Sequence, residues 1–345
     1  MMNIIYGVAG EGRGHLSRSK EIINYLKIKK HKILIITHGQ AYASLSKNFP
    51  TIRINGIHPI FKKNKMELIS SIYNNTFGVI KDLIKWKEIN KKIREFSPDL
   101  FITDFEPFTA RLAYYHNKPL ISIDNQHLLL QEIPSEFKKN NYKNFLISKY
   151  ASRFCVPKAD LFIILSLNKA NIKTKKTIIT PTIIRSEIKK AKKHNHVLVY
   201  LSKPDYDIIK VLEELPENFV VYGYNKDHFY SNINLKKDNQ DFIKNLASCK
   251  AVIATAGFSL ISEAVFLKKP YFALPYYHFE QTLNAHFIKK QGFGEFSEKP
   301  SKKEIMRFLE NLPSYERNLN KTEINGKYSL ELINKAVNEL GIKNL

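Results

Sequence analysis

Short apolar runs alternate with longer amphipathic stretches along the whole chain, which is typical of parallel sheets covered by helices. In the first half, the apolar runs predict strands at Ile4–Val8, Ile33–Thr37, Leu100–Asp104, Leu120–Ile123 and Leu161–Leu165. The amphipathic stretches between them predict helices at Ser17–Lys29, Met66–Phe96 and Pro107–His116.

The same pattern restarts in the second half. Its apolar runs predict strands at Val197–Leu201, Phe219–Tyr222, Ala251–Thr255 and Tyr271–Leu274. Its amphipathic stretches predict helices at Tyr206–Leu215, Asp241–Ser248, Ser259–Leu267 and Glu280–Lys290. Between the halves, residues 181–195 are polar and lysine-rich, as expected for a linker.

The restart predicts an α/β protein with two doubly wound, Rossmann-like domains facing across a cleft. We expect residues 1–183 to form the first domain and residues 184–313 the second, with a helical tail at 314–345 that packs back on the first. Ligands of such sheets bind outside the carboxyl ends of the strands, so candidate chemistry is sought there.

Composition narrows the class of protein. The 345 residues are 43% hydrophobic, enough to bury two cores, and carry a net charge of +23. That charge favours anionic partners, but the lysines are scattered in short pairs, which a lysine-rich composition explains equally well. A nucleic-acid-binding protein would cluster basic and aromatic residues, so that class is disfavoured.

The cysteines and the apolar runs predict the compartment. Cys155 and Cys249 form neither a disulfide framework nor a zinc-ligand pattern, which fits a reducing cytoplasm. The first residues lack a signal-peptide pattern, and no run approaches the roughly 20 apolar residues of a spanning helix. We expect a cytoplasmic protein, with a peripheral position on the inner face of the membrane as an open alternative.

A glycine-rich loop follows the first predicted strand and leads into a helix. Gly10, Gly12 and Gly14 alternate with Glu11 and Arg13 there. Glycines allow a ligand to approach the backbone, and a helix N-terminus favours phosphate. The spacing differs from the dinucleotide motif G-x-G-x-x-G, so a plain strand-to-helix turn is the alternative.

His15 and Asp104 form the candidate catalytic pair. An imidazole near a helix N-terminus is suited to general-base catalysis, and a carboxylate behind it would fix the ring tautomer. Asp104 ends another strand at the same predicted sheet edge. The alternatives are helix capping or ligand orientation for His15, and capping of the helix at Pro107 for Asp104.

A second polar site follows two strands of the second half. The turn at 255–259 precedes a helix, so its amides can bind a pyrophosphate, while Glu263 lies one turn further and can bind a ribose diol or be merely solvated. The next strand leads to a second polar cluster, formed by His278, Glu280, Gln281 and Asn284.

These residues together resemble the donor-site signature of GT-B glycosyltransferases. The residues that carry the resemblance are Ala256, Gly257, Phe258, Ser259, Glu263, Pro270, Pro275, Glu280, Gln281, Asn284 and Ala285. The chain is most similar to the peptidoglycan N-acetylglucosaminyltransferase and to neighbouring archaeal and bacterial families. The segment Gly12–Arg18 resembles their N-terminal glycine loop, and Asp104–Glu106 and Asp124–His127 lie where these families carry acceptor-domain motifs.

The resemblance implies roles for individual residues. Glu263 would bind the ribose, Glu280 and Gln281 the sugar hydroxyls, and the amides of Gly257–Ser259 the diphosphate. Residues implied to flank the base, usually uracil, or to line the acceptor side are Asp241, Phe242, Gly12, Arg13, Gly14, Asp124 and His127. One departure is Ser202-Lys203-Pro204, where the peptidoglycan enzyme has Gly-Gly-Ser; Ser202 could still meet a phosphate.

The expected reaction is inverting, metal-independent transfer of a hexosyl or N-acetylhexosaminyl group from a UDP-sugar, without a cofactor. The acceptor would be a cell-envelope glycan, a lipid-linked molecule or a small molecule. Asp205-Tyr206-Asp207 matches the letters of a metal-binding Asp-x-Asp site, but helix capping explains it. A nucleotide-sugar hydrolase or epimerase on the same fold is the nearest alternative.

Two stretches could contact an anionic membrane. The helix at 81–96 combines Leu83, Trp86, Ile89, Ile93 and Phe96 with basic residues, and 136–154 mixes aromatic residues with lysines. Basic amphipathic helices can lie on bilayers, but packing on a sheet explains the same periodicity and is favoured here.

Overall fold

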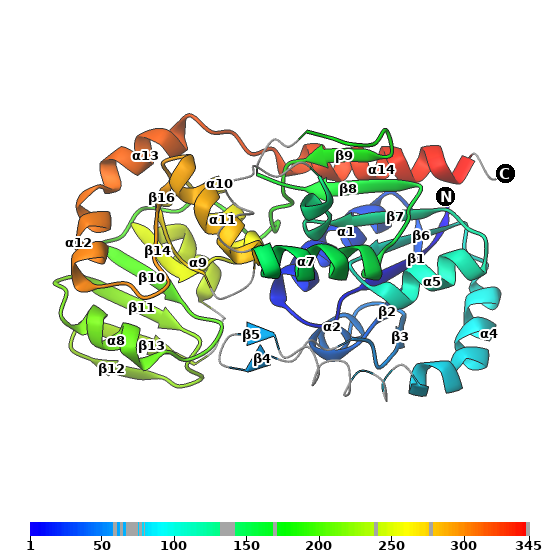
Figure 1. The fold of residues 1–345 in the computed structure, drawn as a ribbon, viewed down its shortest axis with the longest axis horizontal. Coiled ribbons are helices and arrows are strands. Elements are labelled where there is room, and N and C mark those ends of the chain that lie inside the picture. The colour runs from blue at the N-terminus through cyan, green and yellow to red at the C-terminus, as the bar shows by residue number, and fades with distance from the viewer. Residues whose placement is uncertain are drawn as a thin grey trace. The chain divides into compact units, whose positions relative to one another are not determined.

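The chain folds into two compact units, Met1–Ile183 with Asn325–Leu345, and Ile184–Ile324. The structure is a computed structural model, shown in Figure 1. It describes residues 1–57, 61–62, 65–66, 75, 78, 80–131, 142–167, 171–237, 241–275 and 279–342.

The first unit is built on a seven-stranded parallel sheet. Its strands, in spatial order, are β3 (Thr51–Arg53), β2 (Lys32–Thr37), β1 (Asn3–Val8), β6 (Leu100–Asp104), β7 (Leu120–Asp124), β8 (Leu161–Leu165) and β9 (Thr177–Thr180). Strands buried on both faces need continuous apolar runs, which is why β1, β6 and β7 contain hardly any polar residue before their last positions. A separate two-stranded ribbon pairs β4 (Phe61–Lys62) with β5 (Lys65–Met66).

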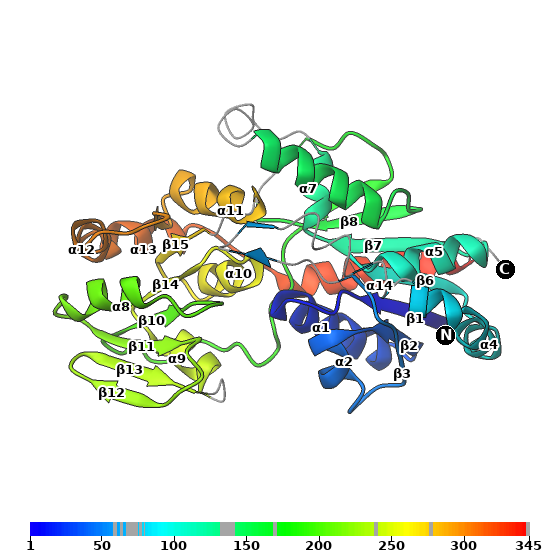
Figure 2. The ribbon, with the colours of Figure 1, turned by 60° about the horizontal axis from the view of Figure 1, so that its bottom comes forward.

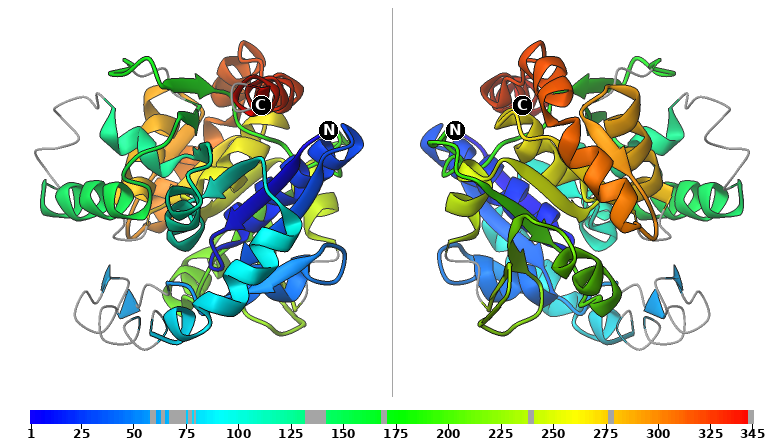
Figure 3. Two further views of the ribbon diagram at one scale, coloured as in Figure 1. Left: turned by 90° about the vertical axis from the view of Figure 1, so that its right-hand side faces the viewer. Right: turned by 90° about the vertical axis from the view of Figure 1, so that its left-hand side faces the viewer.

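Helices cover both faces of this sheet. They are α1 (Arg13–Ile28), α2 (Gly39–Leu45), α4 (Trp86–Phe96), α5 (Pro107–Tyr115), the 3-10 helix η1 (Gln126–Leu130), α7 (Tyr142–Cys155) and α14 (Gly326–Ile342). Helices α4 and α5 pack against one face through Ile89, Ile93 and Leu112 (Figure 3, left). The C-terminal helix α14 contacts α1 and β6 (Figure 2), and Ser329 Oγ donates to the Pro181 carbonyl at 2.7 Å.

The second unit repeats the architecture with another seven-stranded sheet. Its order is β12 (His228–Tyr230), β13 (Ile233–Lys236), β11 (Asn218–Tyr222), β10 (His196–Tyr200), β14 (Ala251–Thr255), β15 (Tyr271–Leu274) and β16 (Gly294–Phe296). Only β12 at the edge is antiparallel to its neighbour. The helices are α8 (Tyr206–Glu213), α9 (Phe242–Ser248), α10 (Phe258–Phe266), α11 (Phe279–Lys290), α12 (Lys302–Glu310) and α13 (Leu312–Asn320).

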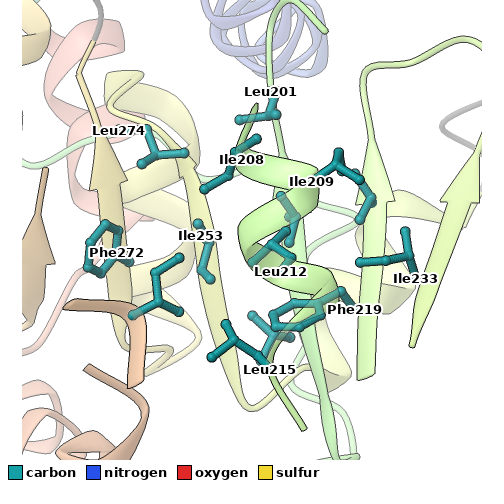
Figure 4. Close-up of a cluster of buried hydrophobic side chains, with 14 of the residues drawn as sticks. Leu201, Ile208, Ile209, Leu212, Leu215, Phe219, Ile233, Ile253, Phe272 and Leu274 are labelled. Carbon is teal, nitrogen blue, oxygen red and sulfur yellow. The ribbon is translucent and has the colours of Figure 1, made fainter. Parts of the chain in front are cut away.

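The core of the second unit joins its sheet to α8 and α12. Phe219, Ile253 and Phe272 of the strands pack in one cluster with Leu212 of α8 (Figure 4). Phe308 of α12 packs edge-on against Phe272, and all five side chains are at most 1% exposed. Burying each such side chain contributes about 1.5–3 kcal/mol, so the periodic apolar pattern is sufficient to specify this layer.

The predicted strands are confirmed, and most of the predicted helices differ only at their ends. The long helix predicted over Met66–Phe96 is wrong at its start, because Met66 lies in β5; part of that stretch falls outside the described residues. Short edge strands such as β3, β12 and β16 were not predicted, because three residues carry too little periodicity.

The boundary of the second unit also differs from the expected one. It lies after Ile324 rather than after residue 313, because α13 groups with the second unit. Within the described residues, no helix has the length and apolarity to cross a membrane.

Candidate functional site

The first site lies where the order of the first sheet reverses. Strands β1 and β6 are neighbours there, and Val8 pairs with Asp104 at their carboxyl ends. The chain leaves β1 through the glycine loop into α1, and leaves β6 through Phe105 into α5. This is the edge at which doubly wound sheets bind their ligands.

His38 holds the glycine loop in place. The backbone amide of Gly10 donates to His38 Nε2 at 3.1 Å. A Cβ at Gly10 would lie 2.3 Å from the ring, and a Cβ at Gly56 2.0 Å from it, so only glycine allows the imidazole to fit between them. Gly12 has a φ of 89°, a conformation that favours glycine, and no side chain caps α1 after it.

His15 lies inside the first turn of α1, next to Asp104. His15 Nδ1 is 2.7 Å from Asp104 Oδ1, and the side chains are 15% and 0% exposed. A carboxylate can only accept, so the proton belongs on Nδ1 and the basic lone pair on Nε2. The amide nitrogen of Gln126 lies 3.4 Å from that Nε2. The predicted pair is confirmed as a contact, and Nε2 is the ring nitrogen that this tautomer leaves to take a proton.

The capping alternatives for both residues are wrong. The N-cap of α1 is Gly12, and the N-cap of α5 is Glu106, whose carboxylate accepts from the amides of Phe108 and Thr109. Asp104 is therefore not used to begin a helix.

Asp104 has two further partners on α1. Arg18 donates to both carboxylate oxygens, Nε to Oδ2 at 2.7 Å and Nη2 to Oδ1 at 2.5 Å, and Ser19 Oγ donates to Oδ2 at 2.8 Å. Burial opposes ionisation of this fully buried acid, but Arg18 and His15 outweigh it and hold the pKa of Asp104 well below its usual range. The carboxylate is thus a fixed anion.

Residues after β6 and β7 complete the site. Arg18 Nη1 donates to Asn125 Oδ1 at 2.8 Å, which ties α1 to the end of β7. Phe105 has a φ of 56°, an uncommon conformation for a residue of its size, and its ring stacks on His15 with centroids 6.1 Å apart. Such strain is retained where surrounding structure holds it, and here it places an aromatic face beside the imidazole.

Asp124 and His127 form a second pair, behind the first. His127 Nδ1 is 2.7 Å from Asp124 Oδ2, Nε2 is 3.2 Å from the Val156 carbonyl, and the two side chains are 1–2% exposed. Both ring nitrogens face acceptors, so these surroundings favour the protonated form of the ring. Because neither side chain reaches the surface, the structure does not support the expected contact of Asp124 and His127 with the acceptor substrate. The pair instead fixes η1 to β7.

The buried pair predicts a pH dependence of stability. Burial lowers the pKa of His127, but Asp124 outweighs it, so the folded pKa lies above the ordinary 6.5. Between pH 6.5 and the folded pKa, the folded state therefore holds a proton on His127 that the unfolded state has lost. The free energy that this proton adds to stability is complete below pH 6.5 and is lost as pH rises through the folded pKa. Each unit of elevation is worth about 1.4 kcal/mol.

The measurement is chemical unfolding followed by Trp86, the only tryptophan of the chain, which lies in the first unit. His127→Gln should abolish the decline in stability above pH 6.5. His31 and His116, whose pKa values burial lowers, titrate below that window. An unchanged decline in the variant would exclude His127 as its source.

The second site is the turn between β14 and α10. Gly257 is the N-cap of α10, no side chain caps it, and a Cβ there would meet nothing within 4 Å. Among the described residues, no side chain therefore caps the first amides of the nine-residue helix, those of Phe258 and Ser259. Asn284 Nδ2 donates to the carbonyl of buried Ala256 at 3.0 Å, which positions the turn against α11.

Glu263 is engaged by a residue that sequence reasoning missed. Arg185, from the stretch expected to be linker, donates through Nε and Nη2 to its two carboxylate oxygens, each at 2.6 Å. The side chains of Arg185 and Glu263 are 24% and 5% exposed. Glu263 is thus oriented from within its own unit, rather than solvated.

The remaining expected donor residues differ in their surroundings. Ser202 is exposed after β10, and Glu280 and Gln281 are half-buried at the start of α11. Asp241 is the exposed N-cap of α9, but Phe242 packs inward against Tyr200 and Tyr222, so its ring belongs to the core. His278 lies outside the described residues.

Two patterns could bind a metal ion: the Asp205-Tyr206-Asp207 sequence and a cluster of His, Cys, Asp or Glu side chains. Neither forms a metal site in the part of the chain that the structure describes. Asp205 caps α8 by accepting from the amides of Asp207 and Ile208, as the capping explanation predicted. No group of three or more His, Cys, Asp or Glu side chains among the described residues is placed to hold a metal ion.

A family model described as glycosyl transferase family 1 matches residues 2–313. The chain belongs to this family. The enzyme is therefore a glycosyltransferase with the two-domain GT-B fold. A search of curated proteins found no match. The narrower resemblance to the peptidoglycan N-acetylglucosaminyltransferase stays a prediction.

Solved structures share the fold of this glycosyltransferase. The calicheamicin glycosyltransferase CalG4 is 14% identical with a TM-score of 0.67, and 98% of each chain is covered. The glycosyltransferase SsfS6 of Streptomyces sp. SF2575 is 13% identical with a TM-score of 0.65, and 96% of each chain is covered. The spinosyn rhamnosyltransferase SpnG, solved with thymidine diphosphate, is 12% identical with a TM-score of 0.62, covering 93% of this chain and 95% of its own.

Sequence reasoning had a usable signal for one of the residues it missed. Arg18 follows His15 by three positions on a helix, which places both on one face. Asn125 and Arg185 pair with residues 107 and 78 positions away, and no local sequence pattern connects them with those partners.

Proposed function

We propose that the enzyme transfers a sugar from a nucleoside diphosphate donor to an acceptor hydroxyl, with inversion at the anomeric carbon and without a metal ion. The observation that carries this proposal is the His15–Asp104 contact at the carboxyl edge of the first sheet, which leaves Nε2 of His15 as the proton acceptor. His15 Nε2 would take the proton as the acceptor oxygen bonds to the anomeric carbon and the bond to the diphosphate breaks.

The donor would bind the second unit. The uncapped amides at the start of α10 would hydrogen-bond the diphosphate and stabilise the charge that it gains on leaving. Glu263, oriented by Arg185, would accept from the ribose hydroxyls, and Glu280 with Gln281 would bind the sugar. The structures of SpnG with thymidine diphosphate and of VinC with dTDP support a nucleoside diphosphate as the donor group. We keep UDP as the expected nucleotide and include dTDP in the test.

The experiment is a ligand-observed NMR screen of UDP-, dTDP- and GDP-sugars, followed by product analysis with glycan, lipid-linked and small-molecule acceptors. A product in which the sugar is bonded to an acceptor supports the proposal. Release of free sugar in the absence of an acceptor indicates a hydrolase. Binding of no nucleotide sugar at all would contradict the proposed donor.

Glu263→Gln provides a residue-level prediction for the donor. Loss of a charge-assisted hydrogen bond should weaken nucleotide-sugar binding by about 10- to 100-fold. Glu316→Gln is the matched control, since Glu316 pairs with Lys193 elsewhere in the second unit. Titration calorimetry measures both variants, and equal affinities would remove Glu263 from the donor site.

We also propose that α7 contacts an anionic membrane surface. The helix has no acidic residue, and its exposed side chains include Tyr142, Lys143, Tyr150, Arg153 and Phe154. We do not propose membrane contact for the other candidate helix, at 81–96, because its apolar residues Ile89 and Ile93 are buried in the core. Co-sedimentation with phosphatidylglycerol vesicles but not with phosphatidylcholine vesicles supports this contact, and no sedimentation with either excludes it.

A further inference from the structure

The first unit contains two His–Asp pairs of the same length, and one difference between their surroundings is the group that balances the carboxylate. In both pairs, Nδ1 of the imidazole lies 2.7 Å from a carboxylate oxygen that is at most 1% exposed. Asp124 receives hydrogen bonds from Ser122, from the His127 amide and from the His127 ring. Asp104 receives a bidentate guanidinium in addition to its imidazole.

Arg18 lies between the members of the first pair. Its Nη2 is 2.5 Å from Asp104 Oδ1 and 2.8 Å from His15 Nδ1. A guanidinium can only donate, so with the proton of His15 on Nδ1, Nη2 and Nδ1 are two donors that share Oδ1 of Asp104. The guanidinium is 5% exposed, so water screens its charge little.

We propose that Arg18 is the positioning residue that keeps His15 an unprotonated base, by neutralising Asp104 and placing a second cation beside the ring. This inference rests on the proposed role of His15 and adds to it. A proton on His15 would face the attraction of Asp104 and, at nearly the same distance, the repulsion of Arg18. The two effects oppose each other, while the contact with Asp104 still orients the ring.

The second pair shows what a buried carboxylate does to an imidazole when a guanidinium acts only from a distance. Burial lowers the pKa of His127, but the charge of Asp124 outweighs it and the pKa is raised. Arg18 lowers the pKa of Asp124 through the longer-range effect of its charge, without a hydrogen bond between the two side chains. A histidine that keeps its proton cannot serve as a general base at neutral pH. The arginine therefore distinguishes the catalytic pair from the structural one.

Among the described side chains, the charged and titratable groups around His15 come from five elements. Arg18 lies on α1, Asp104 ends β6, and the Asp124–His127 pair lies behind Phe105, at the end of β7 and in η1. Tyr6 of β1 is fully buried beside Asp104, and burial raises its pKa far above the working range, so it stays neutral. Arg18 and Asp104 are thus the charged side chains that contact the ring within the described part of the chain.

The test substitutes Arg18→Gln and measures two quantities against pH. In the unliganded protein, the titration midpoint followed by the imidazole NMR signals of His15 should lie about one to two pH units higher in the variant than in the wild type. The acidic limb of the kcat/KM profile should move to higher pH by the same amount. Activity that the variant has lost at pH 7 should therefore return at alkaline pH. A purely structural arginine would lower activity at every pH.

Two further variants serve as controls. Arg53→Gln removes the same charge from an exposed position on β3 and should leave both midpoints unchanged. Arg18→Gln/Asp104→Asn removes both charges and keeps neutral hydrogen-bonding groups, so it stays informative if the single variant does not fold. Because both charges are gone, the midpoint of His15 should move less in this double variant than in Arg18→Gln; a fall of about one pH unit or more below the wild type would mean that Asp104 alone sets the protonation.

The two readouts separate this inference from the proposed function. If the His15 signals move as expected but no sugar transfer occurs in any variant, Arg18 controls the ring and the proposed reaction is wrong. If transfer depends on His15 but Arg18→Gln leaves both midpoints unchanged, the reaction stands and the role of Arg18 is overturned.

Discussion

Replacing His15 with alanine is expected to reduce kcat for sugar transfer by about 10²- to 10⁴-fold, the usual contribution of a positioned general base. The acceptor hydroxyl would then lose its proton only to water. His15 is 15% exposed and contacts Asp104, Arg18 and Gln126, so its loss removes a proton acceptor with little loss of packing.

The measurement is initial rate at saturating donor, with nucleotide-sugar affinity measured in parallel. Donor affinity should be unchanged, because the expected donor residues lie in the other unit. His228→Ala, at an exposed position on β12, controls for the loss of any histidine. A rate within twofold of the wild type would show that another group takes the proton.

Replacing Asp104 with leucine is expected to destabilise the first unit by about 3–5 kcal/mol, because it leaves the buried guanidinium of Arg18 without its carboxylate. Ser19 and His15 would lose the same acceptor. Chemical unfolding followed by Trp86 fluorescence reports on this unit alone, since the chain has no other tryptophan.

The paired variant Asp104→Leu/Arg18→Met separates charge from shape. With no charge left unpaired, it should recover most of the lost stability, because well-packed apolar replacements of buried ion pairs are often close to neutral. Equal destabilisation of the single and paired variants would mean that packing, rather than the unpaired charge, is responsible.

The candidate site was predicted unevenly, for reasons that individual residues make clear. His15 and Asp104 could be paired from the sequence because each follows a strong apolar run, and parallel strands present their carboxyl ends on one edge. Asp124 and His127 follow such a run as well, yet they are buried. A strand end predicts the edge at which a side chain lies, but not whether the next loop covers it.

Phe242 and Glu263 illustrate the same limit in the second unit. An aromatic residue after a loop could flank a base or enter the core, and only its contacts with Tyr200 and Tyr222 decide for the core. Glu263 was recognised as a ligand candidate, but its orientation depends on Arg185, which looked like part of a polar linker.

The sequence by itself determined the alternation of strands and helices, the two-domain α/β class, the glycine loop, and the uncapped turn before α10, because each depends on residues close together in the chain. Only the tertiary structure decided that Arg18 joins Asp104 and Asn125, that Arg185 holds Glu263, and that His15 is partly exposed whereas His127 is buried. Those contacts join residues 78 to 107 positions apart, and burial, which sets the strength of each charge interaction, arises only when the sheet and its loops have assembled.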